Sequence, residues 1–162
     1  MNKFIFLDID GVMNSNLFYS ERTQDKRYNE LLKFHPQRLA WSLCNIDPRA
    51  VARLNRITKA TNALIIVSSS WRFDDNLQEV FTLSGIEQRI SDRTPWSKDR
   101  FRGSEIQEWL DKQTEPYRYV ILDDDNDMLD SQLPYFIQTD WLKWGLSDED
   151  VEQAIHILNA DD

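Results

Sequence analysis

FIFLDIDGVMN, residues 4–14, begins with four apolar residues that run without alternation into two aspartates and a glycine. Such an apolar run predicts a strand buried on both faces, as at the centre of a parallel sheet. Asp8 and Asp10 are two positions apart, so both side chains can face one crevice at the end of the strand. Gly11 lets the chain turn sharply there because it has no side chain. We therefore expect chemistry at the C-terminal end of this strand.

Two carboxylates this close repel each other unless a cation lies between them or one of them holds a proton. The first arrangement is a site for Mg²⁺, a hard cation that prefers oxygen ligands. The second arrangement places a general acid beside a nucleophile. A strand followed by a merely acidic turn is the alternative interpretation, and the later strands decide between them.

Length and composition predict one soluble globular domain, residues 1–162. The chain is 41% hydrophobic and 29% charged, and its 162 residues can bury a core without disulfides or a structural metal. The only cysteine, Cys44, excludes an internal disulfide and a cysteine-rich zinc site. The two histidines, His35 and His156, are far apart in the sequence, which disfavours a zinc centre.

The N-terminus and the net charge bear on location and partners. One lysine and a short apolar run that ends in acids are typical of neither a signal peptide nor a membrane span, so we expect a cytoplasmic protein without membrane contact. The net charge of −9 disfavours binding along the length of a nucleic acid, which relies on basic surface. Contact with a nucleic-acid end at a local basic cluster remains compatible with this charge.

Strand and helix patterns alternate along the chain, which predicts an α/β fold. Asp47 with Pro48 is a strong helix start, and Ser104 with Gln107 forms a capping-box pattern. Short helical crossovers make successive strands parallel, giving a Rossmann-like, three-layer domain with a mainly parallel central sheet. Further strands are expected at residues 63–67, 86–90, 119–122 and 135–138, and helices at 47–61, at 73–84, from Ser104 and from Ser147.

Residues 15–44 form a polar and aromatic segment with weak periodicity. We expect a short insertion with one or two turns of helix around residues 28–34, rather than a separate domain. Because the segment leaves directly from the acidic end of the first strand, it is well placed to cover the site as a small flap or cap. A solvated surface decoration is the alternative.

Polar side chains follow each of the three central strands. Asp8 and Asp10 follow the first, Ser68 and its neighbours follow the second, and Asp123 and Asp124 follow the third. Ligands of open α/β sheets bind at the carboxyl ends of the strands, so we expect these groups to lie near one another.

A basic cluster, Lys98, Arg100 and Arg102, comes just before the helix that leads to the third strand. With the polar strand ends, this cluster supplies what phosphoryl transfer needs: an oxygen nucleophile, a metal site and donors for the phosphate oxygens. The chain has neither GxxxxGK[ST] nor GxGxxG, and its four glycines leave little scope for a nucleotide-cradling loop. A kinase or a dinucleotide enzyme is therefore disfavoured.

Four segments in order, FLDIDGV, IIVSSSWR, the basic cluster and ILDDDND, resemble the motifs of the haloacid dehalogenase superfamily of phosphatases. The resemblance covers nearly all of the chain. SSSWR, RGSEIQEWL and ILDDDND more narrowly resemble the small branch of that superfamily found in RNA-repair proteins and in bacteria and their phages.

The resemblance implies a role for each matching residue. Asp8 would be the nucleophile that forms an aspartyl-phosphate. Asp10 would protonate the leaving group and then activate water, and its main-chain carbonyl would ligate Mg²⁺. Dehalogenase members lack this second acid, so its presence favours phosphate chemistry. Ser68 would bind phosphate through its hydroxyl, with Ser69 as a close second.

Two assignments stay open. Arg102, 21 residues before Asp123, best fits the basic motif, although an arginine departs from the commoner lysine and Lys98 is the alternative. Asp124 is favoured as a Mg²⁺ ligand with Asp123 beside it, while Asp127 is a further or outer carboxylate.

Several side chains are candidates for contact with the rest of the substrate. Arg72 and Asn14 are two of them, although an arginine after a strand often pairs with a nearby acid. Trp71 and Trp96 could stack a base. Trp109 lies on an apolar helix face and is expected in the core.

These observations predict a Mg²⁺-dependent phosphatase with a minimal cap, since neither gap where the superfamily carries a large cap is long enough for one. An open site admits bulky substrates, and with the RNA-repair resemblance this suggests a nucleotide or a nucleic-acid terminal phosphate. A nucleotidase acting on free mononucleotides is one alternative. A binding or regulatory protein that kept the fold without turnover is the other.

Overall fold

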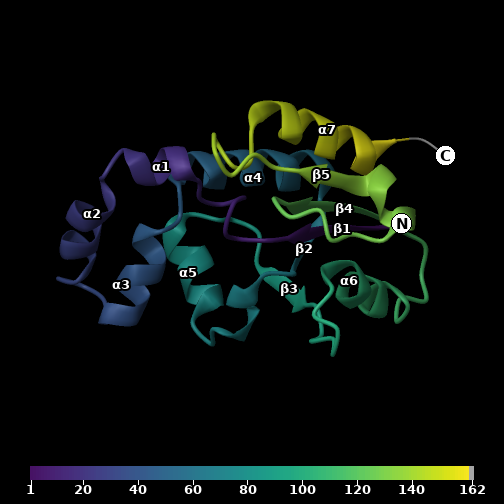
Figure 1. Ribbon diagram of the computed structural model, residues 1–162, viewed down its shortest axis with the longest axis horizontal. Helices are drawn as coiled ribbons and strands as arrows, with labels where there is room; N and C mark the ends of the chain where they lie inside the picture. Colours follow the sequence, from purple (N-terminus) through teal and green to yellow (C-terminus); the bar gives the residue numbers. More distant parts are fainter. Residues whose placement is uncertain (161–162) are drawn as a thin grey trace.

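The computed structural model describes residues 1–160, in which a five-stranded sheet lies between helices (Figure 1). Every strand pairing is parallel, and the spatial order β3-β2-β1-β4-β5 puts the first strand at the centre. The α/β, Rossmann-like fold expected from the sequence is confirmed. The strands are β1 (Asn2–Leu7), β2 (Leu64–Val67), β3 (Ile90–Arg93), β4 (Tyr117–Asp123) and β5 (Phe136–Gln138).

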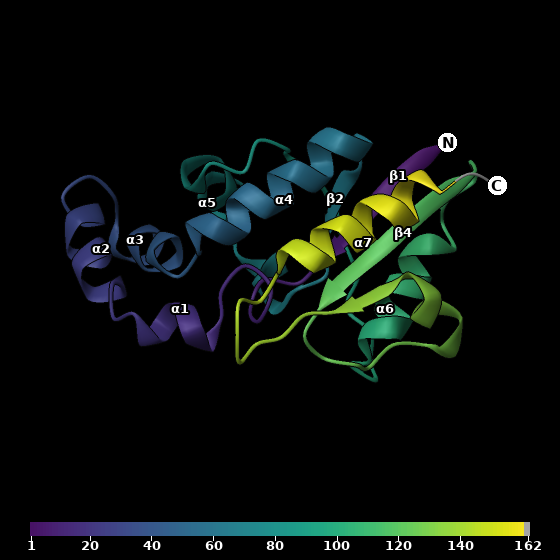
Figure 2. The same cartoon turned by 90° about the horizontal axis from the view of Figure 1, so that it is seen from above.

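Helices cover both faces of the sheet. In Figures 1 and 2, α4 and α7 lie side by side on one face, and α6 lies on the other. Within residues 1–160, no helix combines the length and the apolar character needed to cross a membrane. The helices are α1 (Asn16–Ser20), α2 (Gln24–Leu31), α3 (Gln37–Cys44), α4 (Pro48–Thr61), α5 (Leu77–Ser84), α6 (Arg102–Leu110) and α7 (Asp148–Asn159), with short 3₁₀ helices η1 (Ser70–Phe73) and η2 (Asp130–Tyr135).

The core has two parts because β1 is buried on both faces. Ile5 and Leu7 belong to the apolar cluster that includes residues of α4, α5 and α7. Phe4 and Phe6 belong to the cluster on the α6 side, where Trp109 packs edge-on against them at ring-centroid distances of 4.9 and 5.4 Å. The predicted core position of Trp109 is confirmed, and the two-sided burial explains the unbroken apolar run.

Two of the predicted helix starts are confirmed. The Asp47 carboxylate accepts a hydrogen bond of 2.9 Å from the main-chain nitrogen of Arg49, and Pro48 is the first residue of α4. Ser147 and Asp150 cap α7 reciprocally, each side chain accepting a hydrogen bond from the other's main-chain nitrogen. Local capping chemistry therefore sets the first turns of the two helices that cover one face of the sheet.

The predicted start of α6 at Ser104 is wrong, because the helix begins at Arg102. Its N-terminus is capped from elsewhere in the chain: the Asp127 carboxylate accepts a hydrogen bond of 3.1 Å from the main-chain nitrogen of Arg102. The Ser104 hydroxyl instead donates to Asp99 over 3.2 Å. A tertiary contact has replaced the local capping box, and it fixes the position of Arg102.

Strand β3 and helix α5 also start later than predicted. Residues 86–89 connect to the sheet without pairing with it, because Ile86 packs in the core directly after the end of α5, and pairing begins at Ile90 with Ile65. The helix expected from residue 73 begins at Leu77, since η1 and a turn closed by Asp74 precede it.

Residues 15–44 contain three helices, so the expectation of one or two helical turns is wrong. α3 buries apolar residues against the core, and Arg27 of α2 donates hydrogen bonds to the carbonyls of Leu43, Cys44 and Ile46. In Figure 2 the three helices gather on the side toward which the β4 arrow points. The insertion therefore stands at the carboxyl end of the sheet.

Candidate active site

The register of the central strands brings three chain segments to one level. Leu7 of β1 pairs with Val67 on one side and with Leu122 on the other. The next residues, Asp8, Ser68 and Asp123, therefore lie together at the carboxyl edge of the sheet. Main-chain hydrogen bonds of 3.0 Å continue past the strand ends, from Asp8 nitrogen to Leu122 oxygen and from Ser68 nitrogen to Leu7 oxygen.

Three carboxylates gather at this edge. Asp8, Asp123 and Asp124 each offer an oxygen that lies within 4.8 Å of the others. Asp8 is 7% exposed and Asp123 is 1% exposed, and Oδ2 of Asp123 makes no hydrogen bond with residues 1–160. Three carboxylates that include a buried oxygen, Asp123 Oδ2, that accepts no hydrogen bond from the described residues fit a divalent cation such as Mg²⁺.

Gly11 lets the loop after β1 pass directly against this cluster. Its φ of +81° lies in the left-handed region, where a side chain is strained. A Cβ at this position would also lie 2.5 Å from both carboxylate oxygens of Asp124. Glycine is therefore required here both by the backbone turn and by the approach of Asp124.

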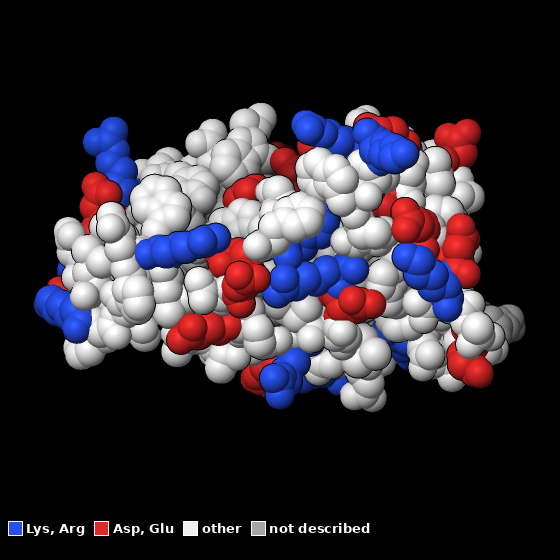
Figure 3. All heavy atoms as spheres, turned by 90° about the horizontal axis from the view of Figure 1, so that it is seen from below, with Lys and Arg blue, Asp and Glu red and all other residues white. Residues whose placement is uncertain are grey.

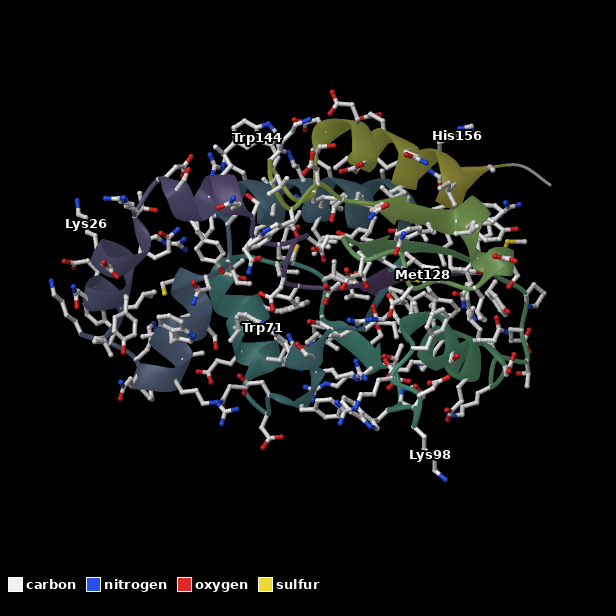
Figure 4. The ribbon with its side chains drawn as sticks, in the orientation of Figure 1. Lys26, Trp71, Lys98, Met128, Trp144 and His156 are labelled. Carbon is white, nitrogen blue, oxygen red and sulfur yellow. The ribbon has the colours of Figure 1, made fainter. Side chains whose placement is uncertain are left out.

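Arg102 is the basic residue that reaches the carboxylates. Its guanidinium lies 3.5 Å from Asp123 Oδ2 and 3.8 Å from Asp8 Oδ1, and its buried Nη1 makes no hydrogen bond within residues 1–160. Lys98 is exposed, and in Figure 4 its side chain points away from the molecule. Of the two candidates for the basic motif, the structure brings only Arg102 to the acids.

Burial disfavours the charged forms of Asp8, Asp123 and Asp124 and so raises their pKa values. It raises the pKa of Asp8 from an ordinary 3.8 to about 6, while Arg102 and the Ser69 side chain act in the opposite direction. Burial, followed by repulsion from Asp8, raises the pKa of Asp123 to about 8. The pKa of Asp124 is raised as well, first by burial and then by Asp125. A cation bound among these groups would favour their charged forms.

Asp10 lies apart from the three carboxylates and faces solvent. Its two oxygens accept hydrogen bonds from Asn14 Nδ2 at 3.0 Å and from Trp71 Nε1 at 2.9 Å. Asn14 is fully buried. Its Oδ1 accepts a hydrogen bond from Gly11 nitrogen, and its Nδ2 also donates to Asn45 oxygen. Asn14 thus holds the loop and Asp10, and the structure does not bring it to a surface where substrate could touch it.

Ser68 and Ser69 are both fully buried at the end of β2. The hydroxyl of Ser68 makes no hydrogen bond within residues 1–160, whereas the hydroxyl of Ser69 accepts from Trp71 nitrogen at 3.3 Å. An unpartnered buried hydroxyl one residue past the strand is available to a ligand oxygen.

Arg72 lies in the interior rather than at the surface of the site. Its Nη2 is 2.8 Å from Glu105 Oε2, and both side chains are 4% exposed. Its Nη1 donates to the carbonyl of Ser69 over 3.1 Å. The arginine therefore connects α6 to the loop after β2, which is the pairing with an acid named as the alternative to substrate contact.

Two supporting residues were missed by the sequence analysis. Thr139 directly follows β5, and its hydroxyl donates to the carbonyl of Gly11 over 2.7 Å; the pattern of polar residues after strands could have found it. Gln132 is fully buried and donates to the carbonyl of Gly103 over 2.9 Å. Nothing local in the sequence distinguishes Gln132 from an exposed glutamine.

A parallel α/β sheet with a buried aspartate cluster, an arginine and hydroxyls at its carboxyl edge defines a domain of the haloacid dehalogenase (HAD) class. Residues 4–151 match the family described as the HAD domain in Swiss Army Knife RNA repair proteins, and the chain belongs to this family. At the level of the superfamily, membership indicates phosphatase chemistry and binding of phosphorylated substrates. Comparison with curated proteins gave no match, and comparison with solved structures gave none.

Proposed function

We propose that this protein is a Mg²⁺-dependent phosphomonoester hydrolase that works through an aspartyl-phosphate on Asp8. The observation that carries the proposal is the position of Asp8, whose buried carboxylate lies among Asp123, Asp124 and the guanidinium of Arg102. A nucleophile, further carboxylates and a cation at one sheet edge are the parts that phosphoryl transfer requires.

Two aspartates share the covalent chemistry. A carboxylate oxygen of Asp8 attacks phosphorus, forming an O–P bond while the bond to the leaving oxygen breaks. Asp10 gives its proton to that leaving oxygen. Asp10 then takes a proton from a water molecule, and the water attacks the aspartyl-phosphate and releases inorganic phosphate and free Asp8. The hydrogen bonds from Asn14 and Trp71 hold the carboxyl group of Asp10 in one orientation.

Donors for the phosphate oxygens come from the end of β2 and from the start of α6. The Ser68 hydroxyl and Nη1 of Arg102 are buried and have no hydrogen-bond partner within residues 1–160, so both can donate to a bound phosphate. Ser69 is the second hydroxyl of this group. Lys98 could approach only through a rearrangement of its loop.

Mg²⁺ would be held by Asp8, Asp123 and Asp124, together with the main-chain carbonyl of Asp10 that the superfamily resemblance implies. When bound, it would offset the negative charge that the acids and the phosphate bring together. Arg102 and the hydroxyls supply only part of that compensation.

The proposed substrate is a nucleotide or a nucleic-acid terminal phosphate. Support comes from the family description, and the net charge of −9 argues for contact with one end rather than along a strand. On the face seen in Figure 3, acidic and basic side chains are interspersed. Residues 15–44 would serve as a small cap within a single domain, and the buried free thiol of Cys44 suits a reducing cytoplasm.

Phosphate release from a panel of phosphomonoesters tests this function. The panel holds mononucleotides and 3′- and 5′-phosphorylated oligonucleotides, each assayed with Mg²⁺ and with EDTA. Release should require Mg²⁺, disappear in Asp8→Asn and persist in Asp75→Asn, which removes an exposed acid instead. If no substrate is hydrolysed by the folded wild-type protein, the chain is a binding protein of the same fold. A preference for free mononucleotides would identify a nucleotidase.

A further inference from the structure

A cavity of about 700 Å³ lies directly beside Asp10. Its walls come from the loop after β1, from α1, α2 and α3, and from η1 with the residue that follows it. Its volume falls within the range of roughly 300–1,000 Å³ that small-molecule sites occupy. If Asp10 protonates the leaving group, as in the proposed function on which this inference rests, the cavity receives that group.

Four aromatic side chains line this cavity: Tyr19, Trp41, Trp71 and Phe73. Trp71 donates a hydrogen bond to Asp10, so its ring lies next to the proposed acid. Trp41 is 60% exposed, and Tyr28 packs edge-on against it with 6.1 Å between the ring centroids. Tyr28 thus orients the ring of Trp41 without covering it. The exposed ring of Trp41 and the half-buried ring of Trp71 line one cavity with the proposed acid, and such rings suit a flat apolar group.

The charges of the cavity wall disfavour an anion inside the cavity. Asp10, Asp25 and Asp74 face one basic residue, Arg38, within the described lining. Arg38 is already paired with Asp74, with 3.5 Å between Nη2 and Oδ1. An additional anion would meet a negative wall without a free cation, so the bound group should be uncharged.

Two amide side chains leave acceptors for a ligand. The side-chain nitrogen of Gln24 donates to the carbonyl of Phe18 over 3.0 Å, and that of Asn45 donates to the carbonyl of Trp41 over 2.9 Å. A carbonyl can only accept, so each amide must turn its nitrogen toward the main chain. The two side-chain oxygens have no hydrogen-bond partner within residues 1–160 and can accept from N–H groups.

We propose that this cavity binds the base of a terminal nucleoside, stacked on Trp41 and Trp71, and that it prefers adenine, guanine and cytosine. Stacking tolerates any base, whereas the two oxygens of Gln24 and Asn45 favour bases whose exocyclic amino group offers two N–H donors over uracil and thymine, whose paired edge offers one. A quaternary ammonium group also suits aromatic and acidic walls, but it has no N–H to donate. The same base can belong to a free nucleotide or to the end of a strand.

Calorimetric titration of phosphate-free ligands tests the cavity without using turnover. Adenosine should bind to the wild-type protein more tightly than uridine, and ribose should not bind measurably. Trp41→Ala should raise the Kd of adenosine about tenfold, the loss expected for one stacking contact, and Trp41→Phe should restore most of it. Trp144→Ala is the matched control, because Trp144 is also exposed but packs on Arg49 outside the cavity. Absence of adenosine binding, or equal effects of the two alanine variants, overturns the proposal.

A series of substrates shows whether the base belongs to a free nucleotide or to a strand end. The same series distinguishes failure of the base site from failure of the proposed phosphatase function. We expect kcat/KM for adenosine monophosphates to exceed that for ribose 5-phosphate. Comparing a mononucleotide with a phosphorylated dinucleotide shows which source the cavity takes. Faster hydrolysis of phosphocholine, or of ribose 5-phosphate, overturns the base site while the phosphatase function stands. If nothing is hydrolysed but adenosine binds through Trp41, the proposed function fails and the base site stands.

Discussion

The main chain at Gly11 lies so close to the Asp124 carboxylate that a Cβ on Gly11 would be 2.5 Å from both of its oxygens. The loop carrying Asp10 and the loop carrying Asp124 therefore approach each other only because residue 11 has no side chain. Since φ at Gly11 is +81°, an alanine would also be strained.

Gly11→Ala should displace Asp124 and lower both Mg²⁺ affinity and kcat/KM by about 10- to 100-fold, as do changes that shift a metal ligand. Gly85→Ala is the control, because Gly85 has a similar φ of +92° but its Cβ would meet only Val51 at 3.9 Å. Both variants should lose about 1–2 kcal/mol of unfolding free energy from the left-handed backbone. Calorimetry with Mg²⁺ should separate them, and equal Mg²⁺ affinities would contradict the role of Gly11.

Arg102→Ala should reduce kcat/KM by about 10²- to 10³-fold, the usual loss when one preorganised donor to a developing charge is removed. Lys98→Ala should leave kcat/KM close to the wild-type value because its side chain is exposed and directed away from the acids. Arg102→Lys should recover part of the loss, since an ammonium keeps the charge but not the bidentate geometry. Steady-state phosphate release measures all three variants, and a larger effect at Lys98 would reverse the assignment.

The candidate site could be predicted from the sequence because its residues follow strands. Asp8, Ser68 and Asp123 come directly after apolar runs, and parallel pairing alone brings such positions to one edge. Mainly local signals predicted these segments, as they predicted the capped starts of α4 and α7. To predict these features, only the composition of each segment and its order in the chain were needed.

What could not be predicted depends on contacts between distant segments. Asp127 caps α6 across 25 positions of sequence, so the local Ser104 and Gln107 pattern gave the wrong start. Arg72 resembles a free surface arginine until α6 places Glu105 against it. The helices of residues 15–44 gain stability from packing on the core, which a weak periodic pattern does not reveal.

The buried pair of Arg72 and Glu105 makes a prediction about stability. Arg72→Ala should lower the unfolding free energy by about 3–5 kcal/mol, because it leaves the Glu105 charge buried without a partner. Urea denaturation measures this loss. In the double variant Arg72→Met with Glu105→Gln, much of the stability should return, since glutamine is neutral and still accepts the hydrogen bond from Ser97 nitrogen.

Phosphatase activity of the same double variant separates positioning from substrate contact. If Arg72 only supports the loop after β2, kcat/KM should recover together with stability. A stable double variant that still fails to bind substrate would instead give Arg72 a direct contact with the phosphate. Glu105→Gln alone is the control for changes at α6, because it keeps Arg72 in place.

The pKa shifts of Asp8 and Asp123 predict how the metal-free protein responds to pH. Both pKa values are raised in the folded state, to about 6 and about 8, from an ordinary 3.8. The folded protein therefore holds protons that the unfolded chain has released, and its stability should fall as pH rises from about 4 through about 8. Mg²⁺ binds the charged forms, so the stabilisation it gives should be small at pH 5 and larger at pH 8.

Thermal unfolding with EDTA and with Mg²⁺ across this pH window measures both effects. Asp123→Asn removes the group with the larger shift, so without metal it should melt above the wild type near pH 8 and gain less from Mg²⁺. Asp75→Asn removes an exposed carboxylate outside this cluster and should keep the wild-type slope. A metal-free wild type whose melting temperature rises between pH 5 and pH 8 would mean that the two acids are charged in the fold even without a metal ion, stabilised by Arg102 and by hydrogen bonds.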